Sequence, residues 1–143
     1  MPSIRKSALV AHSDAQMFTL VDDIKSYPQF LPWCSSADLT LVEARAVEAT
    51  IGVDFLGLKL AFSTRNLRHA PTQIDISLLG GPFRRFAGQW KFTALAAQAC
   101  KIEFHLDYQV QAGVIGAALA PVFEQIASTM VDAFVRRAEQ LYG

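Results

Sequence analysis

Hydrophobic and polar residues alternate with a period of two along much of residues 38–110. Short segments rich in glycine or proline, such as residues 79–82, separate the alternating runs. Such alternation is typical of antiparallel strands that pack one face on a core and expose the other to water. The clearest runs span residues 47–55, 58–63, 74–78, 86–93 and 101–110. With residues 38–43 and a first strand at residues 3–11, the pattern predicts about seven strands.

Two other segments have apolar residues at helical spacing. The first follows Ser13, which forms a capping-box pattern with Gln16, and it ends before Tyr27. The second covers residues 114–142, where Pro121 either lies in the first turn of the main helix or bends a longer one. Only this second segment is long enough to lie across the predicted sheet. The order of elements therefore predicts one α+β domain over residues 1–143, with an apolar cavity wherever helix and sheet do not touch.

The stretch "YPQFLPWC" at residues 27–34 combines two prolines with large apolar side chains. Proline removes a backbone donor and disfavours the α conformation in the residue before it, so an irregular, stiff segment or at most one turn is expected. Two interpretations remain open. The apolar side chains form a rigid flap over the mouth of a cavity, or they fill the end of the core.

The composition excludes several classes of function. Basic and acidic residues both number 13, so the net charge is zero, and the chain lacks the excess of positive charge typical of DNA-binding proteins. Cys34 and Cys100 match no zinc or redox spacing, and no catalytic motif occurs. We expect no metal and no covalent cofactor. The sequence shows neither a secretory signal nor a membrane span, so a soluble, cytoplasmic, non-enzymatic protein is expected.

Four stretches occur in the order known from one protein family: "YPQFLPWC" at 27–34, "TRN" at 64–66, "GPFRRFAGQWKF" at 81–92 and "PVFEQIASTMVDAFVRRAEQLY" at 121–142. Through them the whole chain resembles the coenzyme Q-binding START-domain family, part of the polyketide cyclase/dehydrase and lipid transport superfamily, and within it the RatA-like branch of ribosome association toxins. The resemblance implies a START-like helix-grip fold: a curved antiparallel sheet of about seven strands wrapped around a long C-terminal helix, with short helices after the first strand. One departure from the family pattern is the tight connection "LGLKL" at residues 56–60, where members of the family often carry a longer, more polar stretch.

The resemblance also implies a hydrophobic tunnel that holds ubiquinone or another isoprenoid lipid. The resemblance implies that residues 27–34 lie close to one opening, so the expected lining there is Tyr27, Phe30, Leu31 and Trp33. Alternation and helical spacing turn the other expected lining residues inward: Val53, Phe55, Phe62, Leu78, Phe86, Trp90, Phe104, Tyr108, Leu119, Phe123, Ile126 and Met130. The Tyr108 hydroxyl would need a partner, either a quinone carbonyl or a water. Arg65, Arg84 and Arg85 are candidate contacts for a lipid headgroup or an RNA phosphate, or simply exposed residues of the strands.

Three functions follow as hypotheses. The leading one is a carrier or chaperone that binds a polyprenyl quinone without catalysis. The alternative is a toxin that binds the large ribosomal subunit and blocks subunit association. A cyclase- or dehydrase-type enzyme comes third, because the predicted interior offers almost no polar group. An exposed segment around Trp33 would equally allow a dimer contact or a transient membrane contact.

Overall fold

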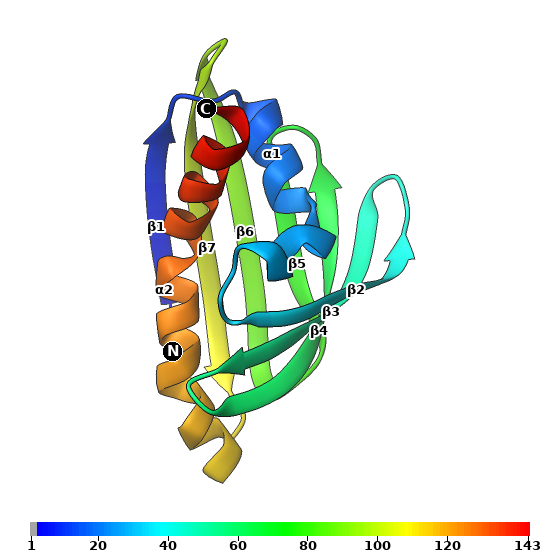
Figure 1. Cartoon of the computed structure of the whole chain (residues 1–143). Coiled ribbons are helices and arrows are strands. Elements are labelled where there is room, and N and C mark those ends of the chain that lie inside the picture. The colour runs from blue at the N-terminus through cyan, green and yellow to red at the C-terminus, as the bar shows by residue number, and fades with distance from the viewer. Residues whose placement is uncertain (1–2) are drawn as a thin grey trace.

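The computed structural model describes residues 3–143 and confirms the predicted helix-grip architecture (Figure 1). All seven strands form one antiparallel sheet in the order β1-β7-β6-β5-β4-β3-β2. Residues 1 and 2, which the predicted domain includes, lie outside the described part of the chain. The strands are β1 (Ser3–Val10), β2 (Cys34–Val42), β3 (Ala46–Phe55), β4 (Leu58–His69), β5 (Gln73–Gly80), β6 (Phe83–Ala96) and β7 (Ala99–Val110).

Three helices cover the concave face of this sheet. Helix α1 (Asp14–Asp22) begins at the predicted capping box, in which Ser13 Oγ accepts from the Gln16 amide at 3.1 Å and Gln16 Oε1 accepts from the Ser13 amide at 2.9 Å. A 3₁₀ helix, η1 (Ile24–Gln29), follows and contains Pro28. The long helix α2 (Val114–Tyr142) contains Pro121 in its interior, so of the two alternatives for this segment the longer helix is the one that forms.

Helix α2 meets the requirements of length and composition for a membrane span. In the fold, however, it lies across the sheet nearest to β1 and β7, and one of its faces is buried there (Figure 1). The residues of that face include Leu119, Phe123, Ile126 and Phe134, which are at most 4% exposed. We therefore interpret α2 as the core helix of the domain.

The start of α2 is fixed against the end of β7 by a glycine. A Cβ built on Gly116 would lie 1.4 Å from the Gln111 carbonyl oxygen, so no other residue fits without a shift of the backbone. At the opposite end of the helix, Arg137 donates to Gln29 Oε1 at 3.1 Å and lies over the Phe30 ring. These two contacts hold the two ends of α2 against different parts of the fold.

Candidate functional site

An internal cavity of about 70 Å³ lies between α2, η1 and the middle strands of the sheet. Helix α2 contacts mainly the β1–β7 side of the sheet, η1 packs on β2, and α1 packs on β6 and β7. Much of the space above the middle strands is therefore filled by side chains. The lining consists of Ile24, Tyr27, Trp33, Ile51, Phe62, Thr64, Asn66, Ile76, Phe86, Trp90, Phe104, Leu106, Phe123, Ile126, Ala127 and Met130. The space equals about two water molecules, since each takes about 30 Å³ in the liquid. Large side chains thus fill most of the predicted tunnel.

The predicted lining residues separate into two groups. The structure brings one group to the cavity: Tyr27, Trp33, Phe62, Phe86, Trp90, Phe104, Phe123, Ile126 and Met130. The others lie elsewhere in the fold: Phe30, Leu31, Val53, Phe55, Leu78, Tyr108 and Leu119. Leu31, Val53 and Leu119 are buried in surrounding core, and Phe55 and Leu78 are half-buried. Alternation separates inside from outside, but it does not tell which inward side chains border the remaining space.

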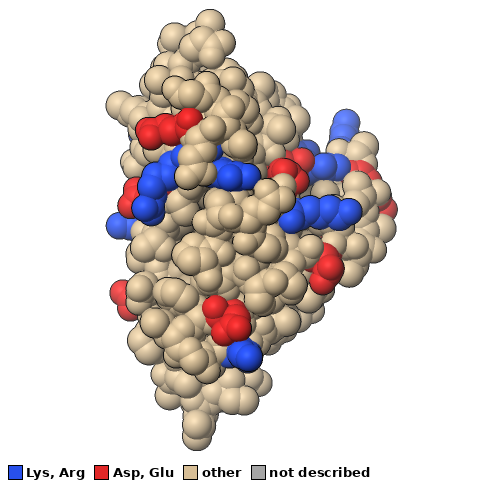
Figure 2. Space-filling model, in the orientation of Figure 1, with Lys and Arg blue, Asp and Glu red and all other residues tan. Residues whose placement is uncertain are grey.

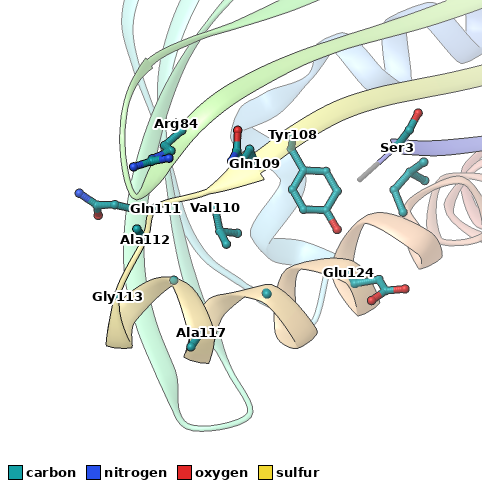
Figure 3. Close-up of a pocket in the computed structure, with 13 residues that line it drawn as sticks. Ser3, Arg84, Tyr108, Gln109, Val110, Gln111, Ala112, Gly113, Ala117 and Glu124 are labelled. Atoms are coloured by element: carbon teal, nitrogen blue, oxygen red, sulfur yellow. The ribbon is translucent and has the colours of Figure 1, made fainter. Parts of the chain in front are cut away.

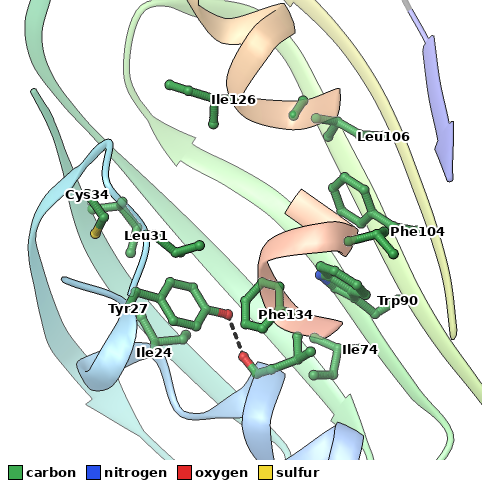
Figure 4. Close-up of a cluster of buried hydrophobic side chains, with 14 of the residues drawn as sticks. Ile24, Tyr27, Leu31, Cys34, Ile74, Trp90, Phe104, Leu106, Ile126 and Phe134 are labelled. Carbon is green, nitrogen blue, oxygen red and sulfur yellow. Dashed lines mark hydrogen bonds between the residues drawn. The ribbon is translucent and has the colours of Figure 1, made fainter. Parts of the chain in front are cut away.

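Residues 27–34 fill the end of the core, and they do not form an exposed flap. Tyr27, Leu31 and Trp33 are at most 8% exposed. The Tyr27 hydroxyl donates to the Val21 carbonyl oxygen, and its ring meets Phe134 edge-on at 5.4 Å (Figure 4). Burial is the main reason that the pKa of Tyr27 is raised, with nearby Asp22 adding to it. Of the two interpretations of this segment, the structure therefore supports the filled end of the core.

Two polar residues, Thr64 and Asn66, line the cavity and were missed in the predicted set. They are 5% and 8% exposed, and Thr64 Oγ1 donates to Asn66 Oδ1 at 3.1 Å. Their signal was present in the sequence, because Phe62 lies inward on β4 and the same alternation continues through Thr64 and Asn66. The interior is therefore apolar with one polar pair.

A larger cleft of about 590 Å³ lies outside this cavity, between the start of α2 and the ends of β1, β6 and β7 (Figure 3). Tyr108 belongs to this cleft. Its ring packs on Phe123 at 4.9 Å, and its hydroxyl points toward α2, from which Glu124 also reaches the cleft. Burial, and then the Glu124 charge, raises the pKa of Tyr108. The hydroxyl thus faces the cleft, and the internal cavity does not include it.

The three predicted arginines do not converge on the cavity. Arg65 lies on the outer face of β4 and forms an ion pair with Glu48 at 2.5 Å. Arg84 borders the cleft around Tyr108. Arg85 is exposed, and its side chain interacts with another group of the described chain. Figure 2 shows charged side chains of both signs over the face that carries α2, with basic ones gathered over the C-terminal half of the helix.

Exposed apolar side chains gather at the N-terminal end of α2. Val114 and Ile115 are 88% and 60% exposed, and they border a groove of about 440 Å³ together with Leu58 and Pro82. The adjoining turn between β3 and β4 exposes Leu56, which adopts a positive φ of 52°. This end of the molecule, and not the segment around Trp33, presents apolar surface to solvent.

The titratable groups form no catalytic arrangement within residues 3–143. His69 and His105 are each hydrogen-bonded to a neighbouring aspartate, Asp75 at 3.2 Å and Asp107 at 3.1 Å, on the outer face of the sheet. His12 is buried beside the Tyr142 ring. No cluster of histidine, cysteine or acidic residues in this described part is suited to a metal. Cys34 and Cys100 are buried and unpaired, and burial raises the pKa of Cys34 to about 11.

Solved structures share the whole fold. An aromatase/cyclase, Zhui of Streptomyces sp. R1128, superposes with a TM-score of 0.86 at 15% identity, covering 97% of this chain and 94% of that one. An 18 kDa protein of Caulobacter crescentus is 30% identical with a TM-score of 0.75, covering 100% of this chain and 99% of that one. At 15% identity the first likeness establishes the fold alone.

Curated relatives carry two kinds of name. The ribosome association toxin RatA of Escherichia coli strain K12 is 41% identical over 143 residues, covering all of this chain and 90% of that protein. A mitochondrial coenzyme Q-binding protein, coq10 of Schizosaccharomyces pombe, is 21% identical, covering 94% of this chain and 85% of that protein.

The family match agrees with the fold and with these relatives. Residues 10–135, from the end of β1 to the last third of α2, match the family described as polyketide cyclase/dehydrase and lipid transport. The match includes the residues from both sheet and helix that enclose the internal cavity. The chain is therefore a member of the polyketide cyclase/dehydrase and lipid transport family, with the START-like fold.

Proposed function

We propose that the protein binds an apolar ligand, such as a prenylated quinone, inside the space between the sheet and α2. The observation that carries this proposal is the internal cavity, which aromatic and aliphatic side chains line and which two polar residues enter. Family membership and the likeness to a coenzyme Q-binding protein support it. The function is that of a carrier or chaperone, without catalysis, because the Tyr27 phenol is the only titratable group among the described residues that line the cavity.

The cavity must expand to take such a ligand. An apolar cavity of about 150 Å³ binds a single benzene ring, and the cavity here, about 70 Å³, has roughly half that volume. Phe86 and Met130 line the cavity but are only half-buried, so their rotation would enlarge it. Each buried methylene group contributes about 0.8 kcal/mol, so one isoprene unit contributes roughly 3 kcal/mol. Two to four such units would offset the cost of association, which is at least about 4 kcal/mol, and of opening the core.

The test uses the two tryptophans as reporters. Trp33 and Trp90 are the only tryptophans of the chain, and both line the cavity. A ubiquinone with two isoprene units should therefore quench the intrinsic fluorescence in a saturable way. The substitution Ala127→Leu fills the cavity from α2 and should weaken binding at least tenfold. The matched control is Ala133→Leu on the same helix, which lies outside the cavity and should leave binding unchanged. Equal affinity in all three proteins, or no saturable quenching of the native protein, would refute the proposal.

A second candidate is association with the ribosome, through its large subunit. The observation in its favour is that relatives about 41% identical over the whole chain are named ribosome association toxins. A groove of about 270 Å³ on the outer face of the sheet offers a surface for it, because Arg5, Lys91 and Lys101 border this groove. Arg84 and Arg85 remain candidate phosphate contacts. The charge balance of the chain means that such a surface must be local.

Cosedimentation with purified 50S subunits at rising salt concentrations tests this candidate. The double substitution Lys91→Glu with Lys101→Glu should abolish binding and flatten its salt dependence. The control Lys25→Glu with Lys59→Glu changes the net charge equally at a distance from the groove and should bind normally. Binding of the Ala127→Leu protein separates the two functions, since ribosome association through the outer face does not need the cavity. Absence of cosedimentation at low salt would eliminate this candidate.

A transient membrane contact stays a prediction, but its expected position moves from the segment around Trp33 to the N-terminal end of α2. The segment around Trp33 is buried, whereas Val114 and Ile115 are exposed beside the groove at the start of α2. If a ligand is exchanged with a membrane, this end of the helix is the surface from which it would enter.

A further inference from the structure

The polar pair Thr64–Asn66 has no evident structural role. Both side chains lie on the inward face of β4, and their neighbours across the sheet are apolar: Val47 and Ala49 on β3, and Ile76 and Leu78 on β5. A buried amide in such surroundings is unfavourable unless its donors and acceptor are hydrogen-bonded. Because β4 is held by its backbone ladder on both sides, an aliphatic residue at either position would serve the sheet equally well.

The hydrogen bonds of Asn66 are incomplete. Its Oδ1 accepts from the Thr64 hydroxyl, and this is the only side-chain hydrogen bond of the Asn66 amide within residues 3–143. The amide nitrogen carries two further donors. Asn66 is 8% exposed and borders the internal cavity, so these donors have the cavity as their remaining surroundings. An acceptor is missing from the position where the ligand of the proposed function would lie.

We propose that Thr64 and Asn66 form the recognition subsite for a neutral carbonyl group on an otherwise apolar ligand. This inference rests on the proposed function and specifies which part of the ligand is read. The Asn66 amide donates to the carbonyl oxygen, and Thr64 fixes the orientation of the amide by donating to its Oδ1.

The surroundings of the pair favour a neutral, planar head. No arginine or lysine lines the cavity, and Arg65 between the two residues is directed outward to Glu48. An ionised carboxylate or phosphate would therefore be buried without a counter-charge. The rings of Trp33, Trp90 and Phe104 border the same space and provide flat surfaces for a ring-shaped head. The chemical class that fits is a cyclic ketone or quinone with an aliphatic tail.

The decisive experiment compares two probes in three proteins. The probes are ubiquinone with two isoprene units and a branched hydrocarbon of similar length that carries no polar group. Their affinities are measured by displacement of the neutral fluorescent dye N-phenyl-1-naphthylamine. Asn66→Leu should weaken quinone binding about tenfold and leave hydrocarbon binding unchanged or stronger. Thr64→Val, which frees the Asn66 amide to rotate, should weaken quinone binding by a smaller factor.

The outcomes separate this inference from the function on which it rests. If the native protein binds neither probe, the proposed function fails. If it binds both and Asn66→Leu lowers neither affinity, the cavity binds ligands but the polar pair does not read them, and this inference is wrong. A bound water that merely satisfies Asn66 gives this second result.

Two further measurements keep the proposal testable if a variant is poorly folded. A purely structural role for Asn66 predicts a lower melting temperature for Asn66→Leu, whereas a subsite held open for a ligand predicts an equal or higher one. In the native protein, the ¹⁵N side-chain amide signal of Asn66 should shift when the quinone is added and stay in place with the hydrocarbon. An unshifted amide signal at saturating quinone would overturn the proposal without any substitution.

Discussion

The two ends of the space under α2 differ in how they are closed. At the C-terminal end of the helix, Phe134 is 0% exposed and lies within 5.4 Å of the rings of Tyr27, Phe30 and Trp90. At the N-terminal end, Val114 and Ile115 lie in solvent beside two open clefts. A packed end resists opening because each displaced ring loses many contacts at once. If a ligand binds in the cavity, we expect it to enter at the N-terminal end, where it would have to displace the half-buried Phe86 from the rings of Phe83 and Phe123.

The largest expected effect separates the two ends by stability. Phe134→Ala removes a fully buried ring and should lower the free energy of unfolding by about 3–5 kcal/mol. Ile115→Ala removes an exposed side chain and should change the free energy of unfolding by less than about 0.5 kcal/mol. Urea denaturation of both variants measures the difference. Similar losses for the two would mean that Ile115 is covered in solution and that the two ends are equally closed.

The second prediction loosens the N-terminal end. Gly116→Ala places a Cβ against the Gln111 carbonyl, so the start of α2 must move, at a cost of about 1–3 kcal/mol. The same movement should speed proteolysis near residues 111–120 and raise the rate of quinone uptake. Gln125→Ala, an exposed position on the same helix that borders neither the cleft nor the groove, serves as the control and should change neither. If the Phe134→Ala protein takes up quinone faster than the Gly116→Ala protein does, the entrance lies at the C-terminal end of α2.

A smaller effect is expected at the filled end of the core. Tyr27→Phe leaves the ring in place but removes the hydroxyl that donates to the Val21 carbonyl, which should cost about 1 kcal/mol. Tyr142→Phe removes an exposed hydroxyl that donates to the Gln16 carbonyl at 3.2 Å and should cost less. The melting temperatures of the two variants rank these two losses of stability. Because the Tyr27 hydroxyl is already engaged, quinone affinity should stay unchanged, and a loss of affinity would restore a gating role for this segment.

The smallest effect concerns the outer face of the sheet and depends on pH. Burial alone would raise the pKa of Asp75, but hydrogen bonds from Gln89 and Gln73 and the proximity of His69 lower it overall. A lowered pKa in the folded state stabilises the protein above the unfolded value of about 3.9, and this contribution is lost as the pH falls through the folded pKa. The melting temperature of Asp75→Asn should therefore lie slightly below that of the native protein at pH 6 and approach it below pH 4. A difference that stays constant across this range would show that Asp75 acts through packing alone.

Local chemistry in the sequence determined the elements of the fold. The Ser13 capping box starts α1, the segment with the two prolines forms no more than the short 3₁₀ helix η1, and alternation marks the strands. These signals act between residues close in the chain, so they are visible without a structure. The same alternation also turns Thr64 and Asn66 inward, but the predicted lining did not include them because it was chosen from apolar and aromatic residues.

Only the tertiary structure decided how much space the interior retains and where it can open. The volume between Trp90, Phe123 and Met130 depends on how side chains from different strands and from α2 interdigitate, and no local pattern encodes that sum. Tyr108 follows the inward pattern of β7, yet the position of α2 assigns it to the outer cleft. Residues 27–34 could have formed a flap or a filled end. Contacts of Tyr27 decided between them: its hydroxyl bonds to Val21 at the end of α1, and its ring packs on Phe134 of α2, which is distant in the chain. Sequence specified which side chains turn inward, and packing between distant segments decided which of them border the remaining cavity.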